Sequence, residues 1–217
     1  MNTIYYVRNG ENPANLTSEF SYKNRLSAEC SGCSASPTNS SVLPRQAITA
    51  VYSSPLKRAL QTAQIIAQPL HLPVLVRKQF REINVGLLED QPPTAETWAI
   101  HDRIFADWFS GKTDICFPSG EDHVTLLHRI RDRLQEALRR RIDQHIIVVG
   151  HSDILAACLS HLCNNIDLRE VIGVHIPNCA ITLFEVAEQQ KGQLRGRLIA
   201  LATCHHLSNT DYECSAS

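Results

Sequence analysis

Three short apolar segments, each closed by small or polar residues, constrain the fold of this chain more than any other feature. β-Branched and aromatic residues form them almost without interruption, which is typical of strands buried on both faces of a sheet. They cover residues 4–7, 48–52 and 146–149, and a shorter segment of the same kind covers 74–76. Residues 181–186 and 198–202 are predicted as two late strands.

Helical patterns lie between and after these strands. Residues 122–142 carry apolar side chains every three to four positions, and residues 56–67, 94–109 and 153–162 are also predicted to be helical. Alternation of strands and helices predicts an α/β fold, with a mostly parallel central sheet between helices. Ligands of such sheets bind beyond the carboxyl ends of the strands, where Arg8, Ser53 and His151 fall.

Size and charge narrow the class of protein. A length of 217 residues predicts one domain, and 21 basic against 22 acidic residues exclude binding to nucleic acids or membrane surfaces through bulk charge. No apolar run is long enough to cross a bilayer, and the first residues do not form a signal peptide. We therefore expect a cytoplasmic protein that binds neither nucleic acid nor membrane.

The eight cysteines are too sparse for a disulfide scaffold. We interpret Cys30-x-x-Cys33 as an accidental pair, because no second pair of this spacing follows. The others are expected to be reduced thiols: Cys116, Cys158, Cys163, Cys179, Cys204 and Cys214.

Five ordered blocks carry the strongest functional signal. They are Arg8-Asn9-Gly10-Glu11, Ser53-Ser54-Pro55-Leu56-Lys57-Arg58, Phe80-Arg81-Glu82, Pro118-Ser119-Gly120-Glu121 and Gly150-His151-Ser152. Taken singly, an arginine on a helix or a glutamate in a loop is more often an ordinary surface residue. Together and in this order, the blocks resemble the histidine phosphatase superfamily, the phosphoglycerate-mutase-like enzymes, over about residues 3–186.

This resemblance implies roles for individual residues. Arg8 and Arg58 would hold the phosphoryl oxygens, since the planar guanidinium binds two oxygens at once. His151 would be the second histidine of the site, and Glu82 the general acid that protonates the leaving oxygen. The predicted polar contacts to the substrate come from Asn15 and Ser152. The resemblance implies no metal and no organic cofactor.

The chain departs from the family pattern at Asn9, where the nucleophilic histidine is expected. A neutral imidazole has a free lone pair that can attack phosphorus, whereas the lone pair of a carboxamide nitrogen is delocalised into the carbonyl. We therefore expect phosphate binding to survive and covalent turnover to be impaired or absent. Two explanations stay open: a trapping or accidental change at this codon, and a natural pseudoenzyme.

A second departure covers residues of about 29–44. Relatives should have a helix with a G-x-x-Q-A pattern there, whereas this stretch contains poor helix formers and a proline. Codons allowed for these residues can spell such a helix when read one base later. Our hypothesis is that the segment is translated out of frame, with the frame restored before Gln46; the nucleotide sequence decides it.

The predicted function is removal of phosphate from a small phosphorylated metabolite through a phosphohistidine. A phosphatase is preferred over a mutase because the insert at about 83–120, interpreted as a helical cap, is modest. The alternatives are a phosphate-ligand-binding pseudoenzyme and a mutase-type phosphotransferase. The insert's large apolar residues would either select the substrate or belong to the core: Trp98, Ile100, Phe105, Trp108 and Phe109. The tail at about 205–217 is expected to be flexible, and the sequence does not indicate substrate identity or oligomeric state.

Overall fold

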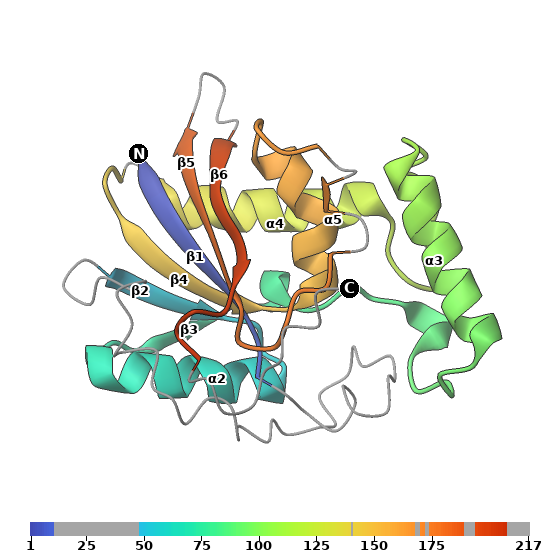
Figure 1. Cartoon of the computed structure of the whole chain (residues 1–217), viewed down its shortest axis with the longest axis horizontal. Coiled ribbons are helices and arrows are strands. Elements are labelled where there is room, and N and C mark those ends of the chain that lie inside the picture. The colour runs from blue at the N-terminus through green and yellow to red at the C-terminus, as the bar shows by residue number, and fades with distance from the viewer. Residues whose placement is uncertain (11–47, 140, 168–169, 172–173, 189–193, 208–217) are drawn as a thin grey trace.

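The computed structural model describes residues 1–10, 48–139, 141–167, 170–171, 174–188 and 194–207 (Figure 1). Three sequence predictions fall outside these ranges: the contact by Asn15, the anomalous segment at about 29–44, and the tail beyond residue 207.

One six-stranded sheet organises the described residues, with the strand order β3-β2-β4-β1-β5-β6. The first four strands in this order pair in parallel, whereas β5 pairs antiparallel with both β1 and β6. The sheet is therefore mixed and mostly parallel, as predicted. The strands are β1 (Asn2–Arg8), β2 (Ile48–Ser53), β3 (Val74–Val76), β4 (His145–Gly150), β5 (Ile181–Glu188) and β6 (Leu194–Thr203).

The central strands are buried on both faces, which confirms the reading of their uninterrupted apolar runs. In β1, Tyr5 and Val7 belong to one apolar cluster, whereas Ile4 and Tyr6 belong to the other. Successive side chains of a strand point to opposite faces, so both faces of the sheet need a covering layer.

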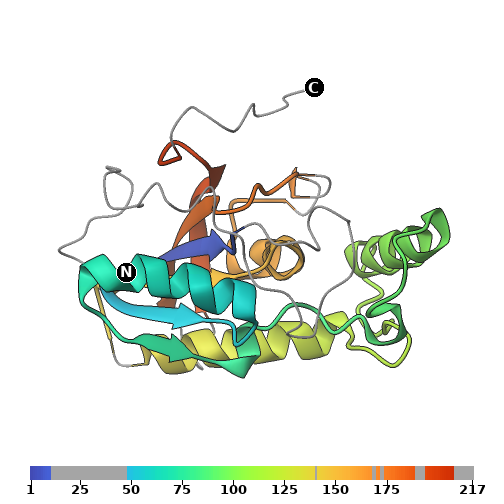
Figure 2. The same cartoon turned by 90° about the horizontal axis from the view of Figure 1, so that it is seen from below.

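Helices supply the two layers. The side of Tyr5 and Val7 is covered by α2 (Lys57–Ala67), and the opposite side by α4 (His123–Leu138) and α5 (Ser152–Leu162). Figure 2 shows β2 and β3 between α2 and α4. The helix α4 begins at the N-cap Asp122 and ends at Leu138, four residues before the predicted end. Short 3-10 turns complete the described helices: η2 (Gln68–Leu70), η3 (Lys78–Phe80) and η4 (Gly86–Leu88).

The region predicted as a cap insert contains η4 and α3 (Ala95–Phe109), and α3 begins at a capping box on Thr94. Trp108 is fully buried, and its indole N–H donates to the carbonyl of Ile115 at 2.6 Å. Trp98 and Phe105 are partly buried against the same core. Packing thus accounts for Trp108, whereas the division of the chain into a domain with a cap stays a prediction.

The thiol predictions need one correction. Cys116, Cys158, Cys163 and Cys204 are free, but Cys179 is disulfide-bonded. Scattered spacing along the sequence does not reveal which cysteines the fold brings together. Separately, within the described ranges, every helix is too short or too polar to span a membrane.

Candidate active site

The candidate site lies at the ends of three neighbouring parallel strands. Arg8 ends β1, Ser53 ends β2, and His151 follows β4 directly. Backbone bonds join these ends, because the N–H of Asn9 donates to Gly150 at 2.9 Å and that of Ser54 donates to Val149 at 3.0 Å. The topology therefore brings together residues that lie far apart along the chain.

A buried chain of hydrogen bonds fixes the ring of His151. Its Nδ1 lies 3.0 Å from Oδ1 of Asn9, and its Nε2 lies 2.8 Å from Oγ of Ser54. The other amide atom of Asn9, Nδ2, donates to the carbonyl of Gly10 at 2.7 Å, so the amide oxygen faces His151. Since a carbonyl oxygen only accepts, Nδ1 carries the proton and Nε2 accepts the hydroxyl hydrogen of Ser54.

The environment keeps this histidine neutral. Burial and the positive charges of Arg58, Arg129 and Arg8 hold the pKa of His151 well below its usual value. Its backbone is held by Tyr6, whose hydroxyl donates to the carbonyl of His151 at 2.9 Å and accepts from its N–H at 2.8 Å.

Ser54, His151 and Asn9 stand in the order of a hydroxyl nucleophile, a base and an orienting group. Ser54 is fully buried, and its Oγ also accepts the N–H of Leu56 at 3.2 Å. Both contacts of this hydroxyl are therefore structural, one to the ring of His151 and one to the backbone of Leu56. We therefore infer that Ser54 orients the ring of His151 and does not act as a nucleophile.

Two arginines give the site its positive charge. Arg58, in the first turn of α2, is only 6% exposed, and burial lowers the pKa of its guanidinium. The negative charges of Glu82, Glu89 and Asp153 oppose that shift in pKa, so carboxylates lie within electrostatic reach of it. Arg8 donates from Nη1 to the carbonyl of Ile176.

Glu82 has the properties of a proton donor. Its Oε1 accepts the N–H of Ile83 at 3.0 Å and that of Ile154, in the first turn of α5, at 3.2 Å. Burial, reinforced by the charge of Asp153, raises the pKa of Glu82 to about 8. A carboxyl group with such a pKa keeps its proton at neutral pH.

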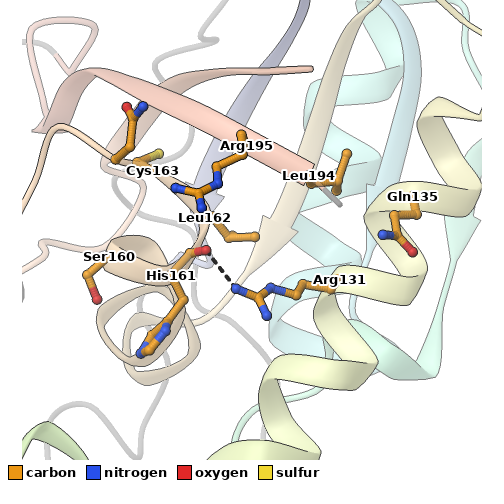
Figure 3. A pocket seen from close by; sticks show the side chains of 9 residues that line it. Arg131, Gln135, Ser160, His161, Leu162, Cys163, Leu194 and Arg195 are labelled. Carbon is orange, nitrogen blue, oxygen red and sulfur yellow. Dashed lines mark hydrogen bonds between the residues drawn. The ribbon is translucent and has the colours of Figure 1, made fainter. Parts of the chain in front are cut away.

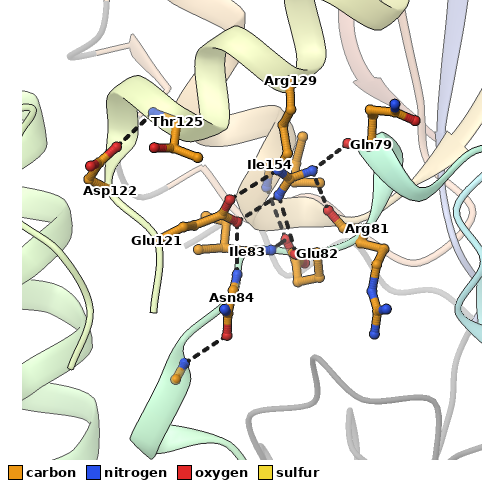
Figure 4. A network of polar contacts seen from close by, with 11 residues as sticks. Gln79, Arg81, Glu82, Ile83, Asn84, Glu121, Asp122, Thr125, Arg129 and Ile154 are labelled. Carbon is orange, nitrogen blue, oxygen red and sulfur yellow. Dashed lines mark hydrogen bonds and ion pairs between the residues drawn. The ribbon is translucent and has the colours of Figure 1, made fainter. Parts of the chain in front are cut away.

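A network around Arg129 of α4 holds the loop that carries Glu82 (Figure 4). Arg129 pairs with Glu121 through both carboxylate oxygens, at 3.0 and 2.7 Å. It also donates to the carbonyls of Gln79, of Arg81 at 2.9 Å and of Glu82 at 3.3 Å. Every residue from 79 to 82 except Phe80 is thus fixed through its backbone.

Glu121 ties this loop to the next one. Its Oε1 also accepts the N–H of Asn84 at 2.8 Å. Gly86 allows the close approach, since it has a φ of +58° and a Cβ there would lie 2.0 Å from the carbonyl oxygen of Pro118. The Pro118–Glu121 block, found by sequence pattern, therefore serves to position the loop of Glu82.

His101 connects α3 to the site. Its Nε2 lies 3.7 Å from Oδ2 of Asp153 and its Nδ1 lies 3.1 Å from Oδ1 of Asp102. Burial of the ring opposes protonation, but the two carboxylates outweigh it and raise the pKa of His101. The same contact lowers the pKa of Asp153, which stays ionised beside Glu82 despite its burial.

The structure places Arg8, Asn9, Arg58, Glu82 and His151 around the same strand ends. Ser152 lies beside them, and its Oγ donates to Asp153 at 3.2 Å. Sequence reasoning missed Ser54, Asp153, His101 and Arg129 as parts of the site. Ser54 and Asp153 adjoin predicted residues and could have been found by position, whereas His101 and Arg129 carry no local signal.

Comparisons with known proteins identify sequence relatives and structures of the same fold. The sequence model described as "Histidine phosphatase superfamily (branch 1)" matches residues 4–196. Phosphoserine phosphatase 1 of Hydrogenobacter thermophilus is 26% identical over 163 residues, which are 75% of this chain and 74% of the relative.

Solved structures show the same fold. A phosphoserine phosphatase of Entamoeba histolytica, in complex with 3-phosphoglyceric acid, superposes with a TM-score of 0.73 at 21% identity, covering 96% of this chain and 100% of that one. A mycobacterial glucosyl-3-phosphoglycerate phosphatase, solved with VO3, gives a TM-score of 0.73 at 18% identity, covering 93% and 99% of the two chains.

Proposed function

Because the chain belongs to branch 1 of the histidine phosphatase superfamily, we propose that it binds a small phosphorylated metabolite at the ends of β1, β2 and β4. Arg8 and Arg58 hold the phosphoryl oxygens, and Asn9 occupies the place of the nucleophile. Turnover through a phosphohistidine is therefore impaired in this chain. The residue that carries the proposal is Asn9, which is 3% exposed and held by its neighbours on both sides of its amide.

The charges of the site favour a phosphate dianion. The charge of Arg8 lowers the pKa of Arg58, and both arginines lower the pKa of His151, so the three groups lie in one electrostatic environment. Like charges held close together in a partly buried site cost free energy, which a bound anion would recover. His151 itself is neutral and supplies hydrogen-bonding capacity rather than charge.

The chemistry of the family explains why Asn9 matters. A histidine nitrogen would form a bond to phosphorus while the bond from phosphorus to the ester oxygen breaks, and Glu82 would pass its proton to the leaving oxygen. Water would then cleave the phosphohistidine and release inorganic phosphate. The amide nitrogen of Asn9 cannot form the first bond, because its lone pair is delocalised into the carbonyl. The two arginines, Glu82 and His151 are all present.

Phosphatase activity in a form with histidine at position 9 is the function we propose for the remaining machinery. The relative from Hydrogenobacter is named a phosphoserine phosphatase, which supports hydrolysis over transfer to a second hydroxyl. The competing proposal is a pseudoenzyme that binds a phosphorylated ligand without turning it over. Both proposals share the same phosphate-binding residues.

The test compares the unmodified chain with Asn9→His, using an aryl phosphate as substrate and rapid denaturation at alkaline pH to trap a phosphoenzyme. We expect negligible turnover in the unmodified chain. In Asn9→His we expect turnover and a phosphoenzyme that is stable to alkali and is lost on acid treatment. Asn9→Ala is the matched control, because it also removes the contact to His151 without providing a nucleophile. Turnover by the unmodified chain that disappears in His151→Ala would overturn the assignment of the nucleophile.

A further inference from the structure

A polar cavity lies at the far end of α5 from His151. It has a volume of about 380 Å³ and is bounded by α4, the end of α5 and the start of β6 (Figure 3). The helix α5 has 11 residues, so roughly 16 Å of helix separates its two ends. None of the residues assigned to the candidate active site lines this cavity.

The residues that line the cavity are positively charged or neutral. Two guanidinium groups line it, from Arg131 of α4 and Arg195 of β6, and none of the nine lining residues is acidic. His161 adds no charge at neutral pH, since burial and the nearby His123 and Arg131 lower its pKa to about 4. The cavity therefore carries a net positive charge.

The carbonyl end of α5 does not cancel this charge. Arg131 donates from Nη2 to the carbonyl of His161 at 2.9 Å, which uses one of the five N–H donors of a guanidinium (Figure 3). A helix C-terminus contributes only about half a negative charge, against two full positive charges. Capping the helix explains one contact of Arg131, but it does not explain why Arg195 lines the same cavity.

The walls of the cavity are fixed by the fold. The N–H of Asn164 donates to the carbonyl of Gly196 at 3.0 Å, next to a bridge between Cys163 and Gly196. Gly196 permits this contact, because a Cβ there would lie 2.8 Å from the carbonyl oxygen of Leu162. The end of α5 is thus pinned to β6, and Arg195 is presented from a paired strand.

We propose that this cavity is a second anion-binding site, which takes a small phosphate ester. Arg131 and Arg195 bind the phosphoryl oxygens, while Ser160, Gln135 and Asn164 supply neutral polar groups around the organic part. Guanidinium groups suit phosphate because of their planar arrangement of donors. A volume of about 380 Å³ exceeds that of phosphate alone and falls within the range of small-molecule sites.

The test follows backbone amide signals of the full chain by NMR during titration with inorganic phosphate and, separately, glycerol phosphate. Signals of residues 160–164 report on this cavity, and those of Gly10 and His151 report on the candidate active site. We expect both sets of amide signals to shift and to reach saturation below about 10 mM ligand. Arg58→Gln should weaken only the active-site response, and glycerol phosphate should bind the cavity more tightly than phosphate does.

Arg195→Gln is the decisive variant, because this exposed side chain can be changed without disturbing the core. We expect it to weaken phosphate binding at residues 160–164 by roughly tenfold or more. Arg131→Gln should do the same, with a thermal melt to separate lost binding from lost stability. The matched control is Arg197→Gln, two residues along β6 and outside the cavity lining.

The possible results of the titrations either support or overturn the proposed anion-binding site. Saturable shifts that Arg195→Gln weakens and Arg197→Gln leaves unchanged would support the site. Shifts that survive Arg195→Gln with the same affinity would overturn it, as would an equal loss in Arg197→Gln, which would indicate diffuse attraction by surface charge. The absence of any saturable shift at residues 160–164 would also overturn it, whatever the active site does.

Discussion

The amide oxygen of Asn9 and Nδ1 of His151 lie 3.0 Å apart in a buried contact between residues 142 positions apart in the chain. This contact joins the end of β1 to the end of β4 and determines which nitrogen of the imidazole carries the proton. Asn9 thus keeps the ring of His151 in a defined orientation. The proposed loss of turnover is for this reason compatible with a preserved geometry around the strand ends.

Replacing Ser54 with alanine should loosen His151. The change removes the partner of Nε2, 2.8 Å away, and leaves both that nitrogen and the N–H of Leu56 without the Ser54 oxygen. We expect Ser54→Ala to lower the free energy of unfolding by about 1–3 kcal/mol, measured by urea denaturation. In the Asn9→His background it should also lower kcat with an aryl phosphate.

Ser53→Ala is the matched control for that change. Ser53 is equally buried, but its hydroxyl donates locally to the carbonyl of Ser54, at 2.8 Å. We expect a smaller effect on kcat in the same background. Equal losses of kcat in both variants would show that Ser54 does not act through His151.

Stability should depend on pH through Glu82. Burial, followed by the charge of Asp153, raises the pKa of Glu82 from 4.5 to about 8 on folding. The folded state therefore holds this proton more tightly than the unfolded state does. The contribution to stability is complete below pH 4.5 and is lost as the pH rises towards 8.

Glu82→Gln isolates this effect, because glutamine stays neutral. Between pH 5 and 8, the free energy of unfolding of the unmodified chain should fall relative to that of Glu82→Gln, by at most about 1.4 kcal/mol per pH unit. Urea denaturation at several pH values measures the difference. Glu96→Gln, at an exposed position in α3, is the control for the removal of one surface carboxylate and is measured at the same pH values. A difference between the unmodified chain and Glu82→Gln that is independent of pH would contradict a raised pKa of Glu82.

The sequence was sufficient to predict the strands and the α-helices, although α4 ends four residues before its predicted end and β6 begins four residues before its predicted start. Uninterrupted apolar runs predicted the central strands, because parallel strands are buried on both faces. Arg8 and His151 follow from the same pattern, since they come directly after two of these strands. These features depend on residues that are neighbours along the chain, so a single sequence could indicate them.

Contacts between distant segments could not be predicted in this way. The pairing of Arg129 with Glu121 becomes visible only once α4 packs beside the loop of Glu82. The approach of His101 to Asp153 likewise depends on how α3 packs against the start of α5. Neither pair has a spacing that distinguishes it from ordinary surface charges, so tertiary packing alone reveals them.

Arg129→Ala should destabilise the loop that carries Glu82. The change leaves the largely buried carboxylate of Glu121 without its cation and three backbone carbonyls without their donor. We expect a loss of roughly 3 kcal/mol or more in the free energy of unfolding, measured by urea denaturation. Arg139→Ala, at the exposed C-cap of the same helix, is the control and should change it by less than about 0.5 kcal/mol. Similar values for the two variants would show that the network contributes little.

The two tryptophans of α3 should differ in their effect on stability. Trp108 is 1% exposed, stacks on the ring of His123 at 5.1 Å and donates to the carbonyl of Ile115, so Trp108→Ala leaves a cavity and an unpaired acceptor. We expect it to cost about 3–5 kcal/mol in the free energy of unfolding.

Trp98→Ala is the comparison, because Trp98 lies on the same helix but is only partly buried against the core. Less apolar surface returns to water, so the expected loss is less than half of that for Trp108→Ala. Urea denaturation of both variants measures the difference. If Trp108→Ala were tolerated as well as Trp98→Ala, α3 would not be packed into the core, and its aromatic residues would have to be explained by ligand contact instead.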